Sequence, residues 1–148
     1  RAQVRQRWGR LLLASLLGGA AASMSALALG WAVGLPADVV LSLAPKSVTA
    51  PVAMGIAEKI GGIPALSAVF AVLTGLTGAL SGKVLFSLLR LPHNDSGWAA
   101  RGFALGTASH GIGAARALQV NADAGAYAGL ALGLQVVLAS LLMPLFFR

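Results

Sequence analysis

Lys46 stands within residues 45–51 (Pro-Lys-Ser-Val-Thr-Ala-Pro), a polar interruption in an otherwise hydrophobic part of the sequence. Each bracketing proline removes a backbone hydrogen-bond donor, so a regular helix is not expected to run through this segment. Pro51 suits the first turn of a following helix, and Ser47 or Thr49 can cap the free amides of that turn. The positive end of the helix dipole then faces the break, beside the Lys46 ammonium group. This chemistry predicts a binding site for a small anion.

A second polar interruption, rich in glycine, lies at residues 107–113 (Thr-Ala-Ser-His-Gly-Ile-Gly). Thr107 and Ser109 offer hydroxyl groups as hydrogen-bond donors. Gly111 and Gly113 allow backbone amides to turn toward a ligand before the next helical piece begins. We therefore expect the two breaks to share one ligand, and the combined donors favour a small carboxylate.

Two residues near the second break have alternative interpretations. His110 could relay a proton, because its reference pKa is about 6.5, or it could be a hydrogen-bonded structural histidine. Arg116 lies one turn into the following helix, where it could hold a carboxylate through two hydrogen bonds or act as a topology signal. Lys46 itself could instead pair with Asp38 or reach the membrane interface.

The remaining motifs do not support enzyme chemistry. The Ser109-His110 pair lacks the first glycine of a nucleophile elbow, and no acid stands where it would orient the histidine. Residues 106–113 lack the Lys-Ser/Thr ending of a phosphate-binding loop. The chain has no cysteine, and its 2 histidines and 4 acidic residues are too scattered for a metal site. We expect no catalytic residue and no resident cofactor, while coupling to a proton or sodium ion stays open.

The composition places the chain in a membrane. It is 57% hydrophobic and only 10% charged, with a mean hydropathy of +0.83, whereas about 25% charged residues is usual for a soluble domain. Three apolar runs, at residues 11–33, 65–89 and 124–147, are long enough as helices to cross a hydrocarbon core of about 30 Å. We therefore predict three full-length transmembrane helices.

Basic residues precede the first of these runs: Arg1, Arg5, Arg7 and Arg10. Such a cluster is normally kept on the cytoplasmic side, so the amino end is expected to face the cytoplasm. A secretory signal also begins with basic residues, but this run is too long and further spans follow it. The net charge of +7 does not indicate nucleic-acid binding, because this flank alone holds a large share of the 11 basic residues.

Each break is flanked by apolar pieces that are too short to cross a membrane. They are residues 37–44 and 52–60 at the first break, and residues 99–106 and the piece ending near 120 at the second. Such a piece extends about 13 Å as a helix, which is half a bilayer. The order is therefore span, broken pair, span, broken pair, span. Interruptions at corresponding positions of two halves point to a transporter site.

We expect one all-α polytopic membrane domain over residues 1–148, with repeat unit A at 11–62, repeat unit B at 65–122 and a final span at 124–147. Each broken pair can either cross the membrane or form a re-entrant hairpin. With hairpins the two units form an inverted repeat, and four basic residues fall toward the cytoplasm: Lys83, Arg90, Arg101 and Arg116. This distribution of charge favours the hairpin arrangement.

Glycines recur four positions apart, a spacing that lets helices approach closely. The sets are Gly30 with Gly34, Gly78 with Gly82, Gly102 with Gly106, and the run Gly125, Gly129 and Gly133. We expect these faces to pack within the chain. A dimer interface is the alternative, so a homo-oligomer stays open.

Three segments resemble the LrgB/CidB family: residues 43–54 (LAPKSVTAPVAM), 61–64 (GGIP) and 102–113 (GFALGTASHGIG), the last followed by Ala117 and Leu118. The family patterns PKSVTxP and GxxxGxxSHxxG are both intact. Family members often have threonine where this chain has Ala50 and Ala114. The resemblance extends from about Leu41 to Pro144.

This resemblance implies a bacterial inner-membrane protein. Family members are described either as antiholin-like or holin-like regulators of murein hydrolases and cell lysis, or as carriers. Plant relatives look like plastidial glycolate/glycerate translocators, and bacterial members are linked to pyruvate uptake. Members usually act with a small LrgA/CidA-type membrane partner. They also extend further toward the amino end, which implies that this chain is the C-terminal part of a longer protein.

Together, the residues and the resemblance predict a transporter of small monocarboxylates of the glycolate, glycerate or pyruvate class. The expected substrate-binding residues are Lys46, Ser47, Thr49, Thr107, Ser109, His110 and Arg116. The alternative is a holin-like or antiholin-like regulator of murein hydrolase export and cell lysis. In that alternative the glycine faces serve oligomerisation and the breaks only shape the packing.

Overall fold

The computed structural model describes the backbone of residues 2–147 and the side chains of residues 8–147. Within this part the chain is all-helical. Its six helices are α1 (Ala2–Ala32), α2 (Ala37–Leu43), α3 (Ala50–Ile60), α4 (Pro64–Leu88), α5 (Asp95–Val120) and α6 (Ala122–Phe146). The side chains of Arg1, Arg5 and Arg7, which the topology argument used, lie outside the described residues.

Three helices are long and apolar enough to cross a membrane: Trp8–Ala32, Pro64–Leu88 and Ala122–Phe146. Their limits agree with the three predicted spans to within a helical turn. The prediction of an all-α protein with three long apolar helices is therefore confirmed.

Local sequence explains where several helices begin and end. Pro64 occupies the opening turn of α4, where its missing N–H costs nothing. The Asn94 side chain accepts a hydrogen bond from Gly97 N (2.9 Å) at the start of α5, and Asn121 accepts one from Ala124 N (3.0 Å) at the start of α6. Gly61 ends α3 with a positive φ of 86°, a conformation that glycine adopts without strain.

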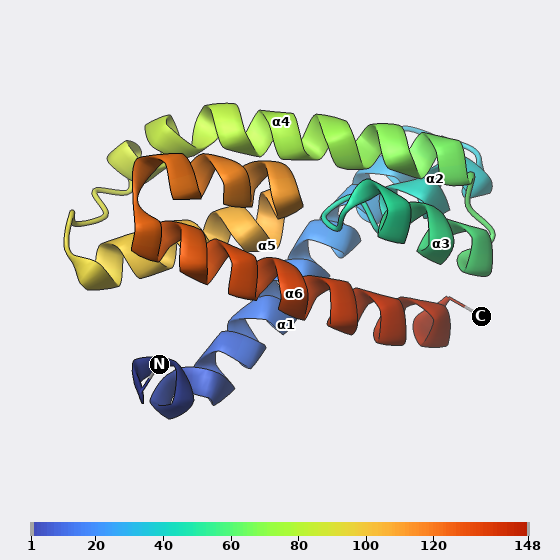
Figure 1. The fold of residues 1–148 in the computed structure, drawn as a ribbon. Coiled ribbons are helices and arrows are strands. Elements are labelled where there is room, and N and C mark those ends of the chain that lie inside the picture. The colour runs from blue at the N-terminus through green and yellow to red at the C-terminus, as the bar shows by residue number, and fades with distance from the viewer. Residues whose placement is uncertain (1, 148) are drawn as a thin grey trace.

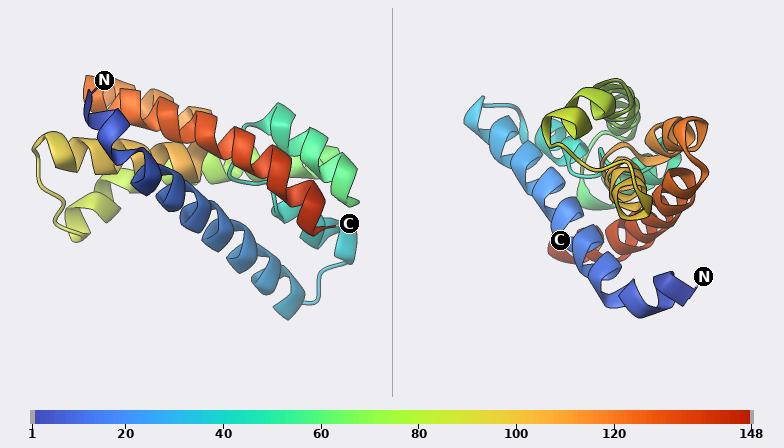
Figure 2. Two further views of the ribbon diagram at one scale, coloured as in Figure 1. Left: turned by 90° about the horizontal axis from the view of Figure 1, so that it is seen from below. Right: turned by 90° about the vertical axis from the view of Figure 1, so that its left-hand side faces the viewer.

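The helices form an elongated bundle in which α4 and α6 run along its length (Figure 1). α2 and α3 lie at one end of the molecule, and α5 extends inward from the other end. α1 crosses this group obliquely and stands out from it when seen from the side (Figure 2). It contacts α2, α5 and α6.

The first break was predicted at residues 45–51 and is observed as a turn between α2 and α3, at residues 44–49. Pro51 lies in the first turn of α3, as predicted. Thr49 occupies the N-cap position, but its side chain makes no capping hydrogen bond, and Ser47 Oγ has no partner either. The expectation that one of these hydroxyls caps α3 is therefore wrong. The hydroxyl of Ser47 is instead left free beside the break.

Ser42 joins α2 of this first hairpin to the start of α4. Its hydroxyl donates to Asp38 O (2.6 Å) and accepts from Ile63 N (2.7 Å), and its carbonyl accepts from Ser67 Oγ (2.6 Å). The side chain is fully buried. Ser42 therefore holds the beginning of α4 against α2.

We predict that Ser42→Ala lowers the free energy of unfolding by about 1–3 kcal/mol, because it removes both hydrogen bonds of the fully buried Ser42 hydroxyl, each worth about 0.5–1.5 kcal/mol. Thermal unfolding of the purified protein in detergent measures the loss. Ser25→Ala is the matched control, since the exposed Ser25 hydroxyl bonds only to Ala22 O of its own helix (3.2 Å). Equal losses in the two variants would contradict the prediction.

The second break is narrower than predicted. α5 is helical on both sides of His110, which alone departs from helical geometry, with φ 41° and ψ −134°. The chain reverses there, so the two halves of α5 lie side by side, as the yellow and orange helices of Figure 1. The predicted wide break at residues 107–113 is therefore wrong, because the turn requires only one residue in the left-handed region.

The glycines after this turn also differ from expectation. Gly111 and Gly113 lie within the helix rather than in an open loop, and neither has a positive φ. A Cβ atom on Gly113 would lie 2.6 Å from Leu105 O and 2.6 Å from Ser109 Cβ. Gly113 therefore allows the two halves of α5 to approach closely.

Most of the glycine faces pack within the chain, as predicted. Cβ atoms on Gly102 and Gly106 would overlap the backbone carbonyls of Ala124 and Ala128, so these glycines set the close contact between α5 and α6. Gly30, Gly78, Gly82 and Gly125 are also in contact with other parts of the chain. Three others have open space instead, with no atom within 4 Å of an added Cβ: Gly34, Gly129 and Gly133.

Two separate hydrophobic clusters accompany the two hairpins. The first surrounds α2 and α3 and includes Val40, Val48 and Ile56. The second joins α5 to α6 and includes Leu105, Ala117 and Ala128.

Candidate binding site between the two helix breaks

A cavity of about 420 Å³ lies where the two breaks meet. Its lining residues come from α1, from both breaks and from one face of α4: Ala22, Leu43, Lys46, Ser47, Phe70, Leu73, Thr74, Thr77, Gly78, Ser81, Ala108 and Ser109. Of the seven residues predicted to bind substrate, the structure brings three to this cavity, namely Lys46, Ser47 and Ser109. They come from segments that are far apart in the sequence.

Lys46 is half-buried at the tip of the first hairpin. No carboxylate is among the residues that line the cavity. Asp38, the alternative partner considered from the sequence, instead accepts a hydrogen bond from Val39 N (2.9 Å) through Oδ1. A half-buried ammonium group in a cavity without a carboxylate is an attractive partner for a bound anion.

Two buried hydroxyl groups without partners belong to residues that line the same cavity as Lys46. In the described part of the chain, neither Ser47 Oγ nor Ser109 Oγ has a hydrogen-bond partner. Ser109 is only 1% exposed, and its hydroxyl lies so close to Gly78 that a Cβ there would overlap it. Because an unpaired buried hydroxyl carries a free-energy cost, both groups are suited to donate to a ligand oxygen.

The α4 helix adds hydroxyl groups that were not predicted as site residues. Thr74, Thr77 and Ser81 line the cavity. Thr77 and Ser81 donate to carbonyls of their own helix, at 2.8 and 2.7 Å. A sequence signal was present, because polar residues spaced three and four apart form a stripe along one face of an otherwise apolar helix.

The other predicted residues do not line this cavity. His110 is buried, and its Nε2 lies 2.7 Å from Ala71 O. A carbonyl oxygen can only accept, so Nε2 carries the proton and donates. This geometry matches the structural role considered for His110. Thr49 occupies the N-cap position of α3, but its side chain makes no capping hydrogen bond. Thr107 lines a neighbouring cavity of about 610 Å³ together with Arg10 and Tyr127.

Arg116 also lies away from Lys46. Its side chain is exposed and its Nη1 donates to Gln119 Oε1 (3.4 Å). It lines a cavity of about 280 Å³ that also contains Lys83 and Arg101. The structure therefore places Arg116 of the second hairpin in a different cavity from Lys46 of the first.

The central cavity adjoins two others along α1. It shares Ala22 and Ala108 with the cavity of about 610 Å³, which extends to Arg10 and Ser96. On its other side it shares Leu43 and Lys46 with a cavity of about 450 Å³, which extends to Val33 and Leu35 near the end of α1. The three spaces form a row, with Lys46 at one of the two boundaries.

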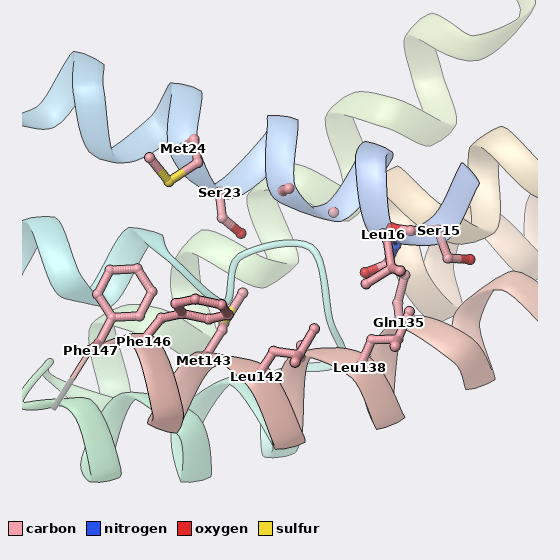
Figure 3. Close-up of a pocket in the computed structure, with 13 residues that line it drawn as sticks. Ser15, Leu16, Ser23, Met24, Gln135, Leu138, Leu142, Met143, Phe146 and Phe147 are labelled. Carbon is pink, nitrogen blue, oxygen red and sulfur yellow. Dashed lines mark hydrogen bonds between the residues drawn. The ribbon is translucent and has the colours of Figure 1, made fainter. Parts of the chain in front are cut away.

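A further cavity of about 430 Å³ lies between α1 and α6 (Figure 3). Leucine, methionine and phenylalanine side chains surround most of it, including Met24, Leu142 and Phe146. Its largest polar side chain, Gln135, is occupied by a hydrogen bond from Nε2 to Ser15 O (2.6 Å). This cavity has no charged group and is a poor site for an anion.

Comparison with known proteins agrees with the resemblance seen in the sequence. The model of the LrgB-like family matches residues 1–148. An uncharacterized protein of Haemophilus influenzae is 31% identical over 146 residues, which cover 99% of this chain and 62% of that protein. YxaC of Bacillus subtilis, also uncharacterized, is 35% identical over 82% of this chain and 51% of its own length.

The holin-like protein CidB of Staphylococcus aureus is 33% identical over 76% of this chain and 48% of its own length. The chain thus spans about half to three-fifths of the length of these curated relatives. No solved structure matches it. With three long apolar helices and a family model that matches it from end to end, the chain is a membrane protein that belongs to the LrgB-like family.

Proposed function

We propose that the protein transports small monocarboxylates of the glycolate, glycerate or pyruvate class, and that the central cavity is the binding site. One observation carries this proposal: an ammonium group and two unpartnered hydroxyls, from two separate helix breaks, line one cavity without a carboxylate. A carboxylate would receive charge-assisted hydrogen bonds there. The volume of about 420 Å³ leaves room for a small substrate together with water.

The proposal includes a re-entrant, inverted arrangement in the bacterial inner membrane. The hairpin of α2 and α3 and the hairpin of α5 extend toward each other from opposite ends of the molecule (Figure 1). Backbone that leaves the helix at membrane depth must be enclosed by protein or line a wet cavity, and the cavity at the two tips meets this requirement. Basic residues gather at the α5 end, including Lys83, Arg101 and Arg116. That end is proposed to face the cytoplasm.

The row of cavities supports passage of a substrate from one side to the other. Ala22 and Ala108 lie between the central cavity and the space on the Arg10 side, and Leu43 and Lys46 lie between it and the space on the other side. In alternating access, only one boundary is open at a time. Lys46 would then hold the anion and also border its exit.

A second function is favoured by a different observation. Gly129 and Gly133 of α6 are exposed and have no atom within 4 Å of an added Cβ. Such a small-residue face is suited to contact with another helix, from a second copy or from a small LrgA/CidA-type membrane partner. It fits the holin-like name of the CidB relative, and hence a regulator of murein hydrolase export and cell lysis.

Uptake into proteoliposomes tests the first function against the second. We expect entry of labelled glycolate, glycerate or pyruvate that saturates with concentration and is reduced by the unlabelled acid. A holin-like pore would instead give a leak that rises linearly with concentration and also passes an uncharged solute of similar size, such as glycerol. Such a leak, after subtraction of the entry measured in protein-free liposomes, would contradict the proposed transport function.

A further inference from the structure

The cavity of about 280 Å³ at the α5 end has an unusual charge. Basic side chains from three helical segments line it: Lys83 of α4, Arg101 of the first half of α5 and Arg116 of the second half. The lining includes no aspartate or glutamate, and in the described part of the chain none of these cations forms an ion pair. Three like charges around one small space repel each other unless an anion lies among them.

Arg101 is held in place by its surroundings. Its Nη2 donates to Leu91 O (2.5 Å), its Nη1 lies 3.3 Å from His93 Nε2, and its guanidinium lies 4.9 Å from the centre of the Trp98 ring. Its Nε is buried and has no partner among the described residues. Lys83 and Arg116 are exposed and able to adjust to a ligand. The arrangement combines one fixed cation with two adaptable ones.

The neighbouring surface indicates where the anion comes from. Leu80, Val84 and Leu88 of α4 are 80%, 68% and 77% exposed, and they follow one another at intervals of one helical turn beside Lys83. Trp98, a residue type that favours the membrane interface, lines the cavity itself. A molecule with an anionic head in the cavity and an apolar tail along α4 would satisfy both surfaces.

We propose that this cavity binds the phosphate of an anionic phospholipid, with Lys83 and Arg116 as its mobile contacts and Arg101 as its fixed one. The three cations offer more donors than a single phosphate needs, so the rest of the head group can also be held. The lipid site is separate from the central cavity and does not depend on what the central cavity binds.

Native mass spectrometry of the delipidated protein in a neutral detergent tests the site, with phosphatidylglycerol and phosphatidylcholine as the added lipids. We expect the protein to prefer phosphatidylglycerol. The double variant Lys83→Gln/Arg116→Gln is expected to weaken its binding by about tenfold or more, as for the loss of charged hydrogen bonds. Lys59→Gln/Arg90→Gln makes the same change of net charge at exposed positions outside the cavity, and should retain binding within about twofold.

Equal weakening in the two double variants would overturn the proposal, because only the overall charge would then matter. Inorganic phosphate is added in a separate experiment. If the protein binds it and shows no preference for phosphatidylglycerol over phosphatidylcholine, the lipid assignment is overturned and the cavity is a site for a soluble anion. Circular dichroism reports whether each variant is folded. If the first double variant is not, the single changes Lys83→Gln and Arg116→Gln, both at exposed positions, are compared with Lys59→Gln.

Discussion

Lys46→Gln is expected to reduce saturable carboxylate uptake by about 10- to 100-fold. The substitution keeps a polar side chain of similar length but removes the positive charge from the central cavity, where no other cation is among the lining residues. A hydrogen bond to a charged group contributes about 1.5–3 kcal/mol, which corresponds to that range of affinity. Initial rates of labelled uptake over a range of substrate concentrations measure the effect.

Lys59→Gln is the matched control for this change. Lys59 is exposed near the end of α3 and does not line the central cavity. Uptake by this variant should stay within about twofold of the parent, as for an exposed charge without a partner. Lys46→Arg keeps the charge and should retain part of the activity. If Lys46→Gln takes up substrate as fast as the parent, the ammonium group is not part of the site.

Gly106→Leu is expected to cause a large loss of stability. An added Cβ at Gly106 would overlap the backbone carbonyl of Ala128, so a leucine forces α5 and α6 apart. Overpacking of this kind costs about 1–3 kcal/mol or more, and here the obstacle is backbone that cannot rotate away. Thermal unfolding in detergent and the yield of monodisperse protein measure the effect.

Gly129→Leu tests whether the effect comes from contact or from the loss of a helical glycine. Gly129 also lies on α6, but nothing stands within 4 Å of an added Cβ. Its substitution should leave the unfolding temperature unchanged or raise it slightly, because leucine favours the helix more than glycine does. A decrease similar to that of Gly106→Leu would show that the α5–α6 contact is not the cause.

The long helices were predictable because their signal is spread over many residues. A charge-free run such as residues 11–33 must be helical in a membrane, whatever its neighbours are. The first break was predictable because Pro45 and Pro51 act locally and do not need a tertiary partner. The breaks were therefore located to within a few residues.

The shape of the second break was not predictable from local preference. His110 adopts a positive φ that favours glycine, while Gly111 and Gly113 beside it remain helical. Tertiary contacts explain this choice, because the His110 ring donates to Ala71 O and packs against Gly75 of α4. The same turn sets the direction of the second half of α5, and so places Arg116 in a different cavity from Lys46.

The site itself was only partly predictable. Lys46, Ser47 and Ser109 stand at the breaks and could be identified as candidates from the interruptions alone. Thr74 belongs to a regular span, and only the packing of α4 against both tips brings it to the cavity. Residues that enter a site through helix packing carry little local signal, so they need the structure.

The two hydrophobic clusters share no residue, but α6 contributes to both, through Ala139 in the first and through Ala124 and Ala128 in the second. Ala71 of α4 also belongs to the first cluster. The two hairpins are therefore connected to each other by the long helices. If the protein transports its substrate as proposed, a movement of either hairpin must carry these helices with it or break the contacts with them, so α4 and α6 would limit how far the two tips can separate around a bound anion.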